Sequence, residues 1–179
     1  EVTVLNLRLD SEQGDKAIVQ LLERFGAQVY VSESAVTVKA SPLRACEIDV
    51  SEIPDLFPIL SVLGAFSKGT TVLFNAGNLR LKESDRILSS AAMITALGGE
   101  VREFPDRLEI TGRPLTGGRA DAFGDHRIAM SAAIAASFCS GQSSVSGAQA
   151  VDKSYPRFFE DYLSLGGRVT LLNESAVKP

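Results

Sequence analysis

The sequence is poor in the residues that metal and redox sites require. Its 179 residues include two cysteines and one histidine. A disulfide framework would need more cysteines, and a zinc site would need closely spaced Cys and His ligands. We therefore expect Cys46 and Cys139, which lie in apolar segments, to be buried thiols in a reducing compartment. With His126 as the only histidine, a protein-only metal site and Ser-His-Asp chemistry are disfavoured, and we expect no metal and no cofactor.

The sequence also lacks an excess of positive charge and a long hydrophobic run. Its 18 Lys and Arg residues against 22 Asp and Glu residues give a net charge of −4. Non-specific nucleic-acid binding needs a basic face, so nucleic acid is not an expected partner. The longest apolar runs have about 14 residues, whereas about 20 are needed to span a bilayer. No signal peptide is visible, so we expect a cytoplasmic protein without a membrane partner.

What the chain does contain is an ordinary globular composition. Hydrophobic residues make up 45% and charged residues 22%, which is usual for a soluble domain. A chain of this length fits one domain, or one large part of a bigger protein. Because Glu1 leads directly into a strand-like segment, we interpret the sequence as a piece of a longer polypeptide.

A helix that ends in glycine and leads into a strand occurs three times. The glycines are Gly26, Gly98 and Gly166. They follow one another at about 70 residues, and such a period indicates a duplicated unit. Glycine supplies the left-handed cap that turns a helix into the next strand. Asn-Leu-Arg-Leu occurs at 6–9 and again at 78–81, at the same distance before the first two glycines.

The first two copies of this unit differ in charge. The second copy carries Lys82, Glu83 and Arg86 after its Asn-Leu-Arg-Leu. The equivalent residues of the first copy are Asp10, Ser11 and Gly14. Because the scaffold is repeated while the charges are not, this pattern favours a functional site over a generic helix-capping pattern.

The apolar pattern predicts repeated βαβαββ units with site residues at helix N-termini. Segments 55–69 and 127–141 are apolar on nearly every side, which predicts helices buried at the centre. We predict one domain over 1–179, made of repeats at 1–40 (partial), 41–112 and 113–179. Strands are expected near 2–8, 28–31, 35–39, 44–48, 71–74, 100–104, 107–111, 144–147 and 168–172. Helices are expected near 14–25, 55–67, 84–97, 127–139 and 156–165.

Two segments are expected to lack regular structure. Residues 112–118 are rich in glycine and turn formers. They predict a connector and not a phosphate loop, because no strand–glycine loop–helix context surrounds them. The tail after Leu172 is expected to fray.

Cations gather at the predicted helix starts. A helix N-terminus presents free N–H groups and the positive end of the dipole, so it binds anions and gains nothing from a cation. Lys82, Arg86, Arg127 and Lys153 all lie at or near such starts. A purely structural sequence would place Asp or Glu there. We therefore expect an anionic ligand that compensates these cations.

Each cluster also has a structural reading. The charged run around Ser84 and Asp85 is also typical of a solvated helix start that one of these two residues caps. Asp55 is likewise typical of a helix cap, and His126 of a hydrogen-bonded structural residue. Residues 153–156 are typical of a strand–turn–helix junction with proline in the first turn. The joint occurrence of these clusters at repeat-equivalent positions favours function.

Four motifs carry a more specific resemblance. They are 51–55 (Ser-Glu-Ile-Pro-Asp), 79–86 (Leu-Arg-Leu-Lys-Glu-Ser-Asp-Arg), 124–130 (Gly-Asp-His-Arg-Ile-Ala-Met) and 153–156 (Lys-Ser-Tyr-Pro). In order and spacing they resemble the C-terminal half of the 5-enolpyruvylshikimate-3-phosphate synthase (3-phosphoshikimate 1-carboxyvinyltransferase) family, over nearly the whole chain. The resemblance implies an α/β fold: an inside-out, barrel-like domain with buried parallel helices and outer sheets.

The resemblance also implies an activity that needs a second domain. The family transfers the enolpyruvyl group of phosphoenolpyruvate to the 5-hydroxyl of shikimate 3-phosphate in chorismate biosynthesis, and releases phosphate by addition and elimination through a tetrahedral ketal. The expected partners are these two substrates and the N-terminal domain of the same polypeptide. We expect the isolated chain to fold without catalysing, and the full-length enzyme to be a monomer.

By this resemblance, three residues contact shikimate 3-phosphate. Asp55 and Asn78 would bind its hydroxyls, with Asp55 as the base on the attacking hydroxyl. Lys82 would bridge the two substrates. We therefore expect Asp55 and Lys82, together with Glu83, to be the catalytic residues.

The same resemblance assigns the remaining residues to phosphoenolpyruvate. Glu83 would donate a proton to its methylene carbon. Arg86, Arg127 and Lys153 would hold its carboxylate and phosphate, and His126 would support that clamp. Arginine suits this role because its planar fork matches carboxylate and phosphate.

Two other functions stay open. The related enolpyruvyl transferase that acts on UDP-N-acetylglucosamine shares the fold. A non-catalytic repeat domain that binds a phosphorylated metabolite is the second alternative. The Lys-Glu-Ser-Asp-Arg and Asp-His-Arg-Ile-Ala-Met runs favour the shikimate enzyme, and the asymmetric charges disfavour a purely structural role.

Overall fold

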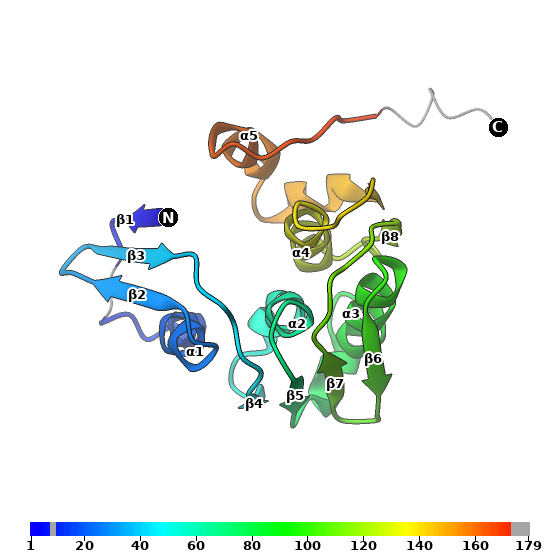
Figure 1. Ribbon diagram of the computed structural model, residues 1–179, viewed down its shortest axis with the longest axis horizontal. Coiled ribbons are helices and arrows are strands. Elements are labelled where there is room, and N and C mark those ends of the chain that lie inside the picture. The colour runs from blue at the N-terminus through cyan, green and yellow to red at the C-terminus, as the bar shows by residue number, and fades with distance from the viewer. Residues whose placement is uncertain (8–9, 173–179) are drawn as a thin grey trace.

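The computed structural model describes residues 1–7 and 10–172 (Figure 1). In chain order the elements form three groups: a small sheet with one helix, a larger sheet with its helices, and two short strands with the last two α-helices. Arg8 and Leu9 of the first Asn-Leu-Arg-Leu copy lie outside the described residues. So does the tail after Leu172, for which we predict fraying.

The first group is an antiparallel sheet with one helix. Its strands are β1 (Val2–Leu5), β2 (Gln28–Val31) and β3 (Ala35–Lys39), in the spatial order β1-β3-β2. Its helix begins as a 3-10 turn, η1 (Gly14–Ala17), and continues as α1 (Ile18–Arg24). The predicted elements are confirmed, except that the first strand ends at Leu5. It ends there because Asn6 turns the chain with a left-handed φ of 61°.

The second group is a complete βαβαββ unit. Its elements are β4 (Glu47–Asp49), η2 (Pro54–Leu56), α2 (Phe57–Ala65), β5 (Thr70–Phe74), η3 (Gly77–Leu81), α3 (Arg86–Ala96), β6 (Glu100–Glu103) and β7 (Leu108–Thr111). The sheet order is β4-β5-β7-β6, with β4 and β5 parallel and the other pairs antiparallel. The predicted order of strands and helices is confirmed here, and η3 is an additional short helix.

The third group is less complete. Its elements are β8 (Arg119–Asp121), α4 (His126–Ala136), β9 (Ser144–Ser146), η4 (Ala148–Lys153) and α5 (Phe158–Ser164), and β8 pairs with β9 in parallel. Residues 112–118 form the predicted connector without helix or strand. The strand predicted at 168–172 is wrong: these residues are irregular. A strand forms only where a neighbouring strand pairs its N–H and C=O groups. In the described chain, no strand pairs with residues 168–172.

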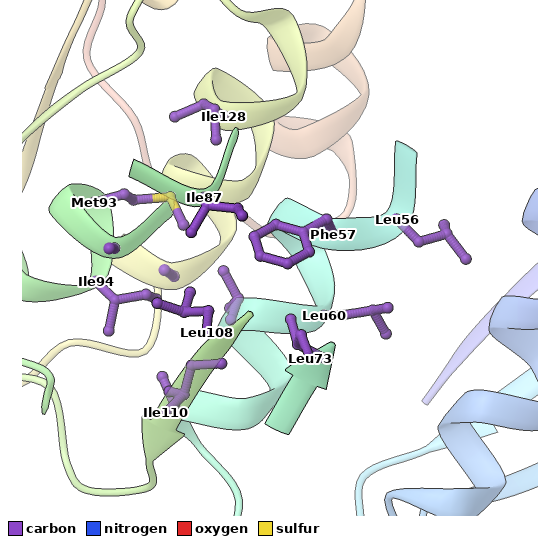
Figure 2. Close-up of a cluster of buried hydrophobic side chains, with 14 of the residues drawn as sticks. Leu56, Phe57, Leu60, Leu73, Ile87, Met93, Ile94, Leu108, Ile110 and Ile128 are labelled. Atoms are coloured by element: carbon purple, nitrogen blue, oxygen red, sulfur yellow. The ribbon is translucent and has the colours of Figure 1, made fainter. Parts of the chain in front are cut away.

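The core lies between α2, α3, α4 and the second sheet. Figure 2 shows Phe57 and Leu60 of α2 gathered with Ile87 of α3 and Ile128 of α4, and all four are fully buried. Figure 1 shows the three helices side by side and nearly end-on, with the sheet outside them. Most residues of α2 and α4 are buried. The prediction of central apolar helices with outer sheets is therefore confirmed.

Three glycines end helices as predicted. Gly26, Gly98 and Gly166 have φ values of 92°, 89° and 91°. In each case the glycine N–H and the next N–H donate to carbonyls of the last helical turn, at 2.8 to 3.0 Å. Glycine suits this Schellman arrangement because it has no Cβ to oppose a positive φ. After the first two glycines the chain enters β2 and β6, respectively.

Two smaller expectations concern the thiols and the membrane. Cys46 and Cys139 are free thiols, but each is only partly buried, so the expected full burial is wrong. Both lie where elements end, Cys46 just before β4 and Cys139 just after α4, and such positions keep some contact with solvent. No helix in the described part of the chain is long and apolar enough to cross a membrane.

Candidate active site

The N-terminal ends of α2, α3 and α4 meet at the side chain of Arg86. Arg86 is the first residue of α3, and its side chain is 1% exposed. Its Nη1 donates to Asp55 Oδ1 at 2.6 Å and its Nη2 to Glu83 Oε2 at 2.8 Å. Its Nε donates to Asp125 Oδ2 at 3.0 Å, and Nη1 also reaches the Pro54 carbonyl at 3.3 Å. One buried guanidinium therefore binds three carboxylates from three parts of the chain.

Asp55 joins the two arginines of the site. It lies in η2, just before α2, and its Oδ2 accepts from Arg127 Nη2 at 2.5 Å. Its side chain caps neither η2 nor α2. Burial raises the pKa of Asp55, but the hydrogen bond from Arg86 and the charges of Arg127, Arg86 and Lys82 outweigh burial and hold the pKa below its ordinary value. The Asp55 carboxylate is therefore ionised at neutral pH.

Asp125 anchors the start of α4 and is fully buried. Its Oδ1 accepts from the Arg127 backbone N–H at 2.8 Å, which makes it the N-cap of the helix. Its Oδ2 accepts from Arg86 Nε and from Ser84 Oγ, the latter at 3.2 Å. Burial raises the pKa of Asp125, but the hydrogen bonds from Arg86 and Arg127 outweigh burial and hold the pKa below its ordinary value. One carboxylate thus fixes both a helix start and a guanidinium.

Asp85 gives α3 a matching N-cap. Its Oδ1 accepts from the Leu88 N–H at 3.1 Å, so of the two candidate caps Asp85 is the one that caps. Its Oδ2 pairs with Arg80 at 2.7 Å, and Arg80 also contacts Glu103 at 3.0 Å. This helix start therefore has both the capping residue of the structural interpretation, Asp85, and the expected cation, Arg86. The dipole of α3 is satisfied by Asp85, while Arg86 is compensated by other carboxylates.

Glu83 and Lys82 form the solvent side of the cluster. The Glu83 side chain is 38% exposed and has Arg86 as its partner. Lys82 is exposed, and its charge lies close enough to Asp55 to lower the pKa of that carboxyl. The structure therefore brings together Asp55, Lys82, Glu83, Arg86 and Arg127, five of the residues that the sequence predicts for one site.

His126 and Arg127 carry buried nitrogens without a partner among the described residues. His126 is the first residue of α4 and is 7% exposed, and its Nδ1 makes no hydrogen bond there. The Arg127 Nε is likewise buried and unpaired. A buried polar group that lacks a partner costs about 1–3 kcal/mol. Such groups are favoured where a ligand completes their hydrogen bonds.

Asn78 and Lys153 lie outside the hydrogen-bonded cluster. Asn78 is exposed in η3, and Lys153 is exposed at the last position of η4. Within residues 1–7 and 10–172, neither side chain makes a hydrogen bond or ion pair with the Arg86 cluster. Their predicted roles as substrate ligands stay predictions.

A pocket opens beside Asp55 and Arg127. Its volume is about 250 Å³. The other lining residues come from η2, α2, α4 and α5: Leu56, Ile59, Met130, Ser131, Ile134 and Phe158. The pocket therefore has one charged wall and otherwise largely apolar walls, as small-molecule sites commonly do.

The arrangement suits chemistry on an anion. Two guanidiniums supply planar donors for carboxylate or phosphate, and partly exposed carboxylates beside them can take or give a proton. Sequence reasoning assigns no site role to Asp125, which accepts from Arg86, or to Ser84, which donates to Asp125. The signal that points to Asp125 is an Asp directly before the first residue of both α3 and α4.

Comparison with known proteins identifies the fold. The chain superposes on EPSP synthase from Acinetobacter baumannii with a TM-score of 0.81 and 27% identity, over 91% of this chain and 41% of that one. It superposes on the enolpyruvyl transferase NikO from Streptomyces tendae with a TM-score of 0.70 and 24% identity, over 93% of this chain and 38% of that one, which shows the fold alone. The chain therefore has the enolpyruvyl transferase fold.

Sequence comparison identifies the family. A sequence profile of EPSP synthase (3-phosphoshikimate 1-carboxyvinyltransferase) matches residues 1–162, and the chain belongs to this family. The 3-phosphoshikimate 1-carboxyvinyltransferase of Clostridium novyi is 44% identical over 93% of this chain and 38% of its own length. That of Methanocella arvoryzae is 43% identical over 94% of this chain and 40% of its own length. The chain spans about two fifths of the length of the curated relatives it matches.

Proposed function

We propose that the chain is one part of an enzyme that transfers the carboxyvinyl group of phosphoenolpyruvate to the 5-hydroxyl of shikimate 3-phosphate. The observation that carries this proposal is the cluster of Arg86 and Arg127 with Asp55 and Glu83 at three helix starts, in a chain of the EPSP synthase family. A substrate pair with several negative charges needs several cations, and preorganised cations stabilise charge that develops during reaction.

Asp55 acts as the base in this proposal. Its lowered pKa leaves it ionised at neutral pH, as a proton acceptor must be. The 5-hydroxyl oxygen bonds to C2 of phosphoenolpyruvate while its proton passes to Asp55. Asn78, which is exposed in η3, binds a shikimate hydroxyl. Lys82 lies between the two substrates, consistent with its electrostatic contact with Asp55.

Glu83 gives a proton to C3 in the same addition step. The product is a tetrahedral ketal with a methyl group. In the elimination, the Glu83 carboxylate takes a proton back from the methyl group and the carbon–carbon double bond forms again. The bond from C2 to the phosphate oxygen breaks, and phosphate leaves with the electrons of that bond. Arg86, Arg127 and Lys153 bind the carboxylate and phosphate of phosphoenolpyruvate, and the unpaired His126 nitrogen supports this clamp.

A second domain completes the site. The relatives are about two and a half times as long as the part that this chain covers, and Lys153 and Asn78 face solvent here. The isolated chain is therefore inactive. We also propose that the full-length enzyme is a cytoplasmic monomer. The UDP-N-acetylglucosamine enzyme is the less favoured reading, because the family match and the similar proteins are shikimate enzymes.

Glu83→Gln in the full-length enzyme tests the proton-donor role. We expect substrate binding to persist and turnover to fall about 10²–10⁴-fold, the range for loss of a general acid. Phosphate release from both substrates measures turnover, and isothermal titration measures binding. Glu33→Gln is the control, because Glu33 is exposed in the loop between β2 and β3. Turnover close to wild type in Glu83→Gln would contradict the assignment.

A further inference from the structure

Three carboxylates share Arg86, and they differ in how firmly they are held. Asp125 is 0% exposed, whereas the side chains of Asp55 and Glu83 are 37% and 38% exposed. Asp125 also accepts from the Arg127 backbone N–H and from Ser84 Oγ. Glu83 has Arg86 as its partner, and Asp55 has the two guanidiniums. Solvent can therefore replace the contacts of Asp55 and Glu83 but not those of Asp125.

The three carboxylates also use different edges of the guanidinium. Asp125 accepts from Nε. Asp55 accepts from Nη1 and Glu83 from Nη2, one nitrogen each. The Nη1 and Nη2 donors form a planar fork that a single carboxylate or phosphate fits bidentately. One such anion would therefore replace both Asp55 and Glu83, and would leave the Asp125 contact untouched.

From this geometry we infer that Asp125 is a positioning residue for Arg86, and that Asp55 and Glu83 are placeholders that the anionic substrate displaces. The inference rests on the proposed anion-binding function of this site. Displacement leaves both carboxylates beside the anion that replaced them, in reach of the groups whose protons they are proposed to move. Asp125 meanwhile keeps the guanidinium plane fixed from the buried side.

The inference predicts opposite effects for two substitutions of the same type. Glu83→Gln removes a competing charge from the fork, so inorganic phosphate should bind about threefold more tightly, a change of ~0.7 kcal/mol. Asp125→Asn removes the buried anchor but keeps a side chain that caps helices well. Phosphate should then bind about tenfold or more weakly, because Arg86 loses its fixed orientation.

The experiment is a titration of the 179-residue chain with inorganic phosphate, followed by ¹H–¹⁵N NMR. The Nε–H signal of Arg86 reports the Asp125 contact. In wild type, we expect this signal to keep its position when phosphate is added. In Asp125→Asn, we expect it to move when phosphate is added, while the backbone amide signals show that the chain stays folded. Asp125→Glu should restore part of the affinity. Asp85→Asn is the control, because Asp85 caps α3 without touching Arg86, and it should leave phosphate affinity unchanged.

The outcomes separate the inference from the function beneath it. If phosphate binds to wild type but more weakly to Glu83→Gln, Glu83 is not a placeholder, although the anion site stands. If Asp125→Asn and Asp85→Asn bind phosphate as wild type does, Asp125 is not a positioning residue. If no variant binds phosphate at Arg86, both the inference and the proposed anion site fail.

Discussion

At the scale of single residues, Arg86 lies where a helix dipole disfavours a cation, and its neighbours explain why. Three carboxylates surround it, so its burial leaves no unpaired charge. The sequence was sufficient to predict that Arg86, Glu83 and Asp55 belong to one site. It was not sufficient to predict the contact with Asp125, because that contact spans 39 residues and depends on how α3 packs on α4.

Removing Arg86 should expose the cost of burying Asp125. In Arg86→Met the Asp125 carboxylate stays buried without a guanidinium, so the free energy of unfolding should fall by about 3–5 kcal/mol. The double variant Arg86→Met/Asp125→Asn should regain part of this loss, because it buries no charge. Urea denaturation measures both. Arg157→Met is the control, since its exposed pair with Glu160 should matter little. No recovery in the double variant would contradict the argument.

The pKa values of Asp55 and Asp125 predict how stability depends on pH. Both pKa values are lower in the folded chain than in the unfolded chain, so the unfolded chain binds protons first. Their contribution is complete above the unfolded pKa of about 3.9 and is lost as pH falls through the folded pKa values. The wild type should therefore lose stability below about pH 4. In Asp125→Asn, the free energy of unfolding from urea denaturation should fall less steeply between pH 5 and pH 2. An equal slope in wild type and variant would show that the pKa of Asp125 does not differ between the folded and the unfolded chain.

At the scale of elements, the sequence predicts helices better than strands. The all-apolar segments and the glycine caps predict α1 to α5, because both signals are local. The strand β8 has only three residues, with charged residues at both ends, and forms because β9 lies beside it. The residues at 168–172 have a strand-like alternation but form no strand in the described chain. Whether β8 and residues 168–172 become strands depends on whether a second strand pairs with them, and sequence alone does not reveal which strands pair.

Repeat spacing relates two residues that contact one another in the structure. Asp55 and Arg127 lie at the same distance before Gly69 and Gly141, so they occupy equivalent positions at the starts of two central helices. In the structure these two side chains bond to one another at 2.5 Å. Equivalent helices that pack side by side bring equivalent positions together, which explains why a site forms between repeats.

Two of the helix-ending glycines form a matched pair for testing the cap. Gly98 and Gly166 have φ of 89° and 91°, so alanine at either position should cost about 1–2 kcal/mol of backbone strain. A Cβ at Gly98 would also lie 2.2 Å from Thr116 Oγ1, whereas a Cβ at Gly166 meets nothing within 4 Å. Gly98→Ala should therefore reduce the free energy of unfolding more than Gly166→Ala. Equal losses by urea denaturation would show that Thr116 moves aside without cost.

At the scale of the whole molecule, the first sheet leaves apolar side chains exposed to solvent. The strand register places six valines on one face of β1, β2 and β3. They are Val2, Val4, Val29, Val31, Val36 and Val38. Val2, Val4 and Val31 are about half exposed, and β1 is an edge strand within the described residues. In the second sheet, the equivalent strand β5 is paired with β4 along that edge and contacts α2.

We propose that the chain is divided into repeats at 41–112 and 113–179, each a copy of the βαβαββ unit, with 1–40 as an incomplete copy.

A partly exposed apolar face beside the free edge of β1 in the described chain predicts self-association of the isolated chain, because both features favour contact with another chain. Val4→Lys places a charge on the valine face and should shift the chain toward monomer. Thr3→Lys is the matched control, because Thr3 is the neighbouring residue of β1 and points to the opposite face. Sedimentation velocity over a concentration series measures the association. Association that survives Val4→Lys would show that the valine face is not the contact, and equal dissociation by both variants would place the contact at the strand edge, where either lysine disturbs pairing.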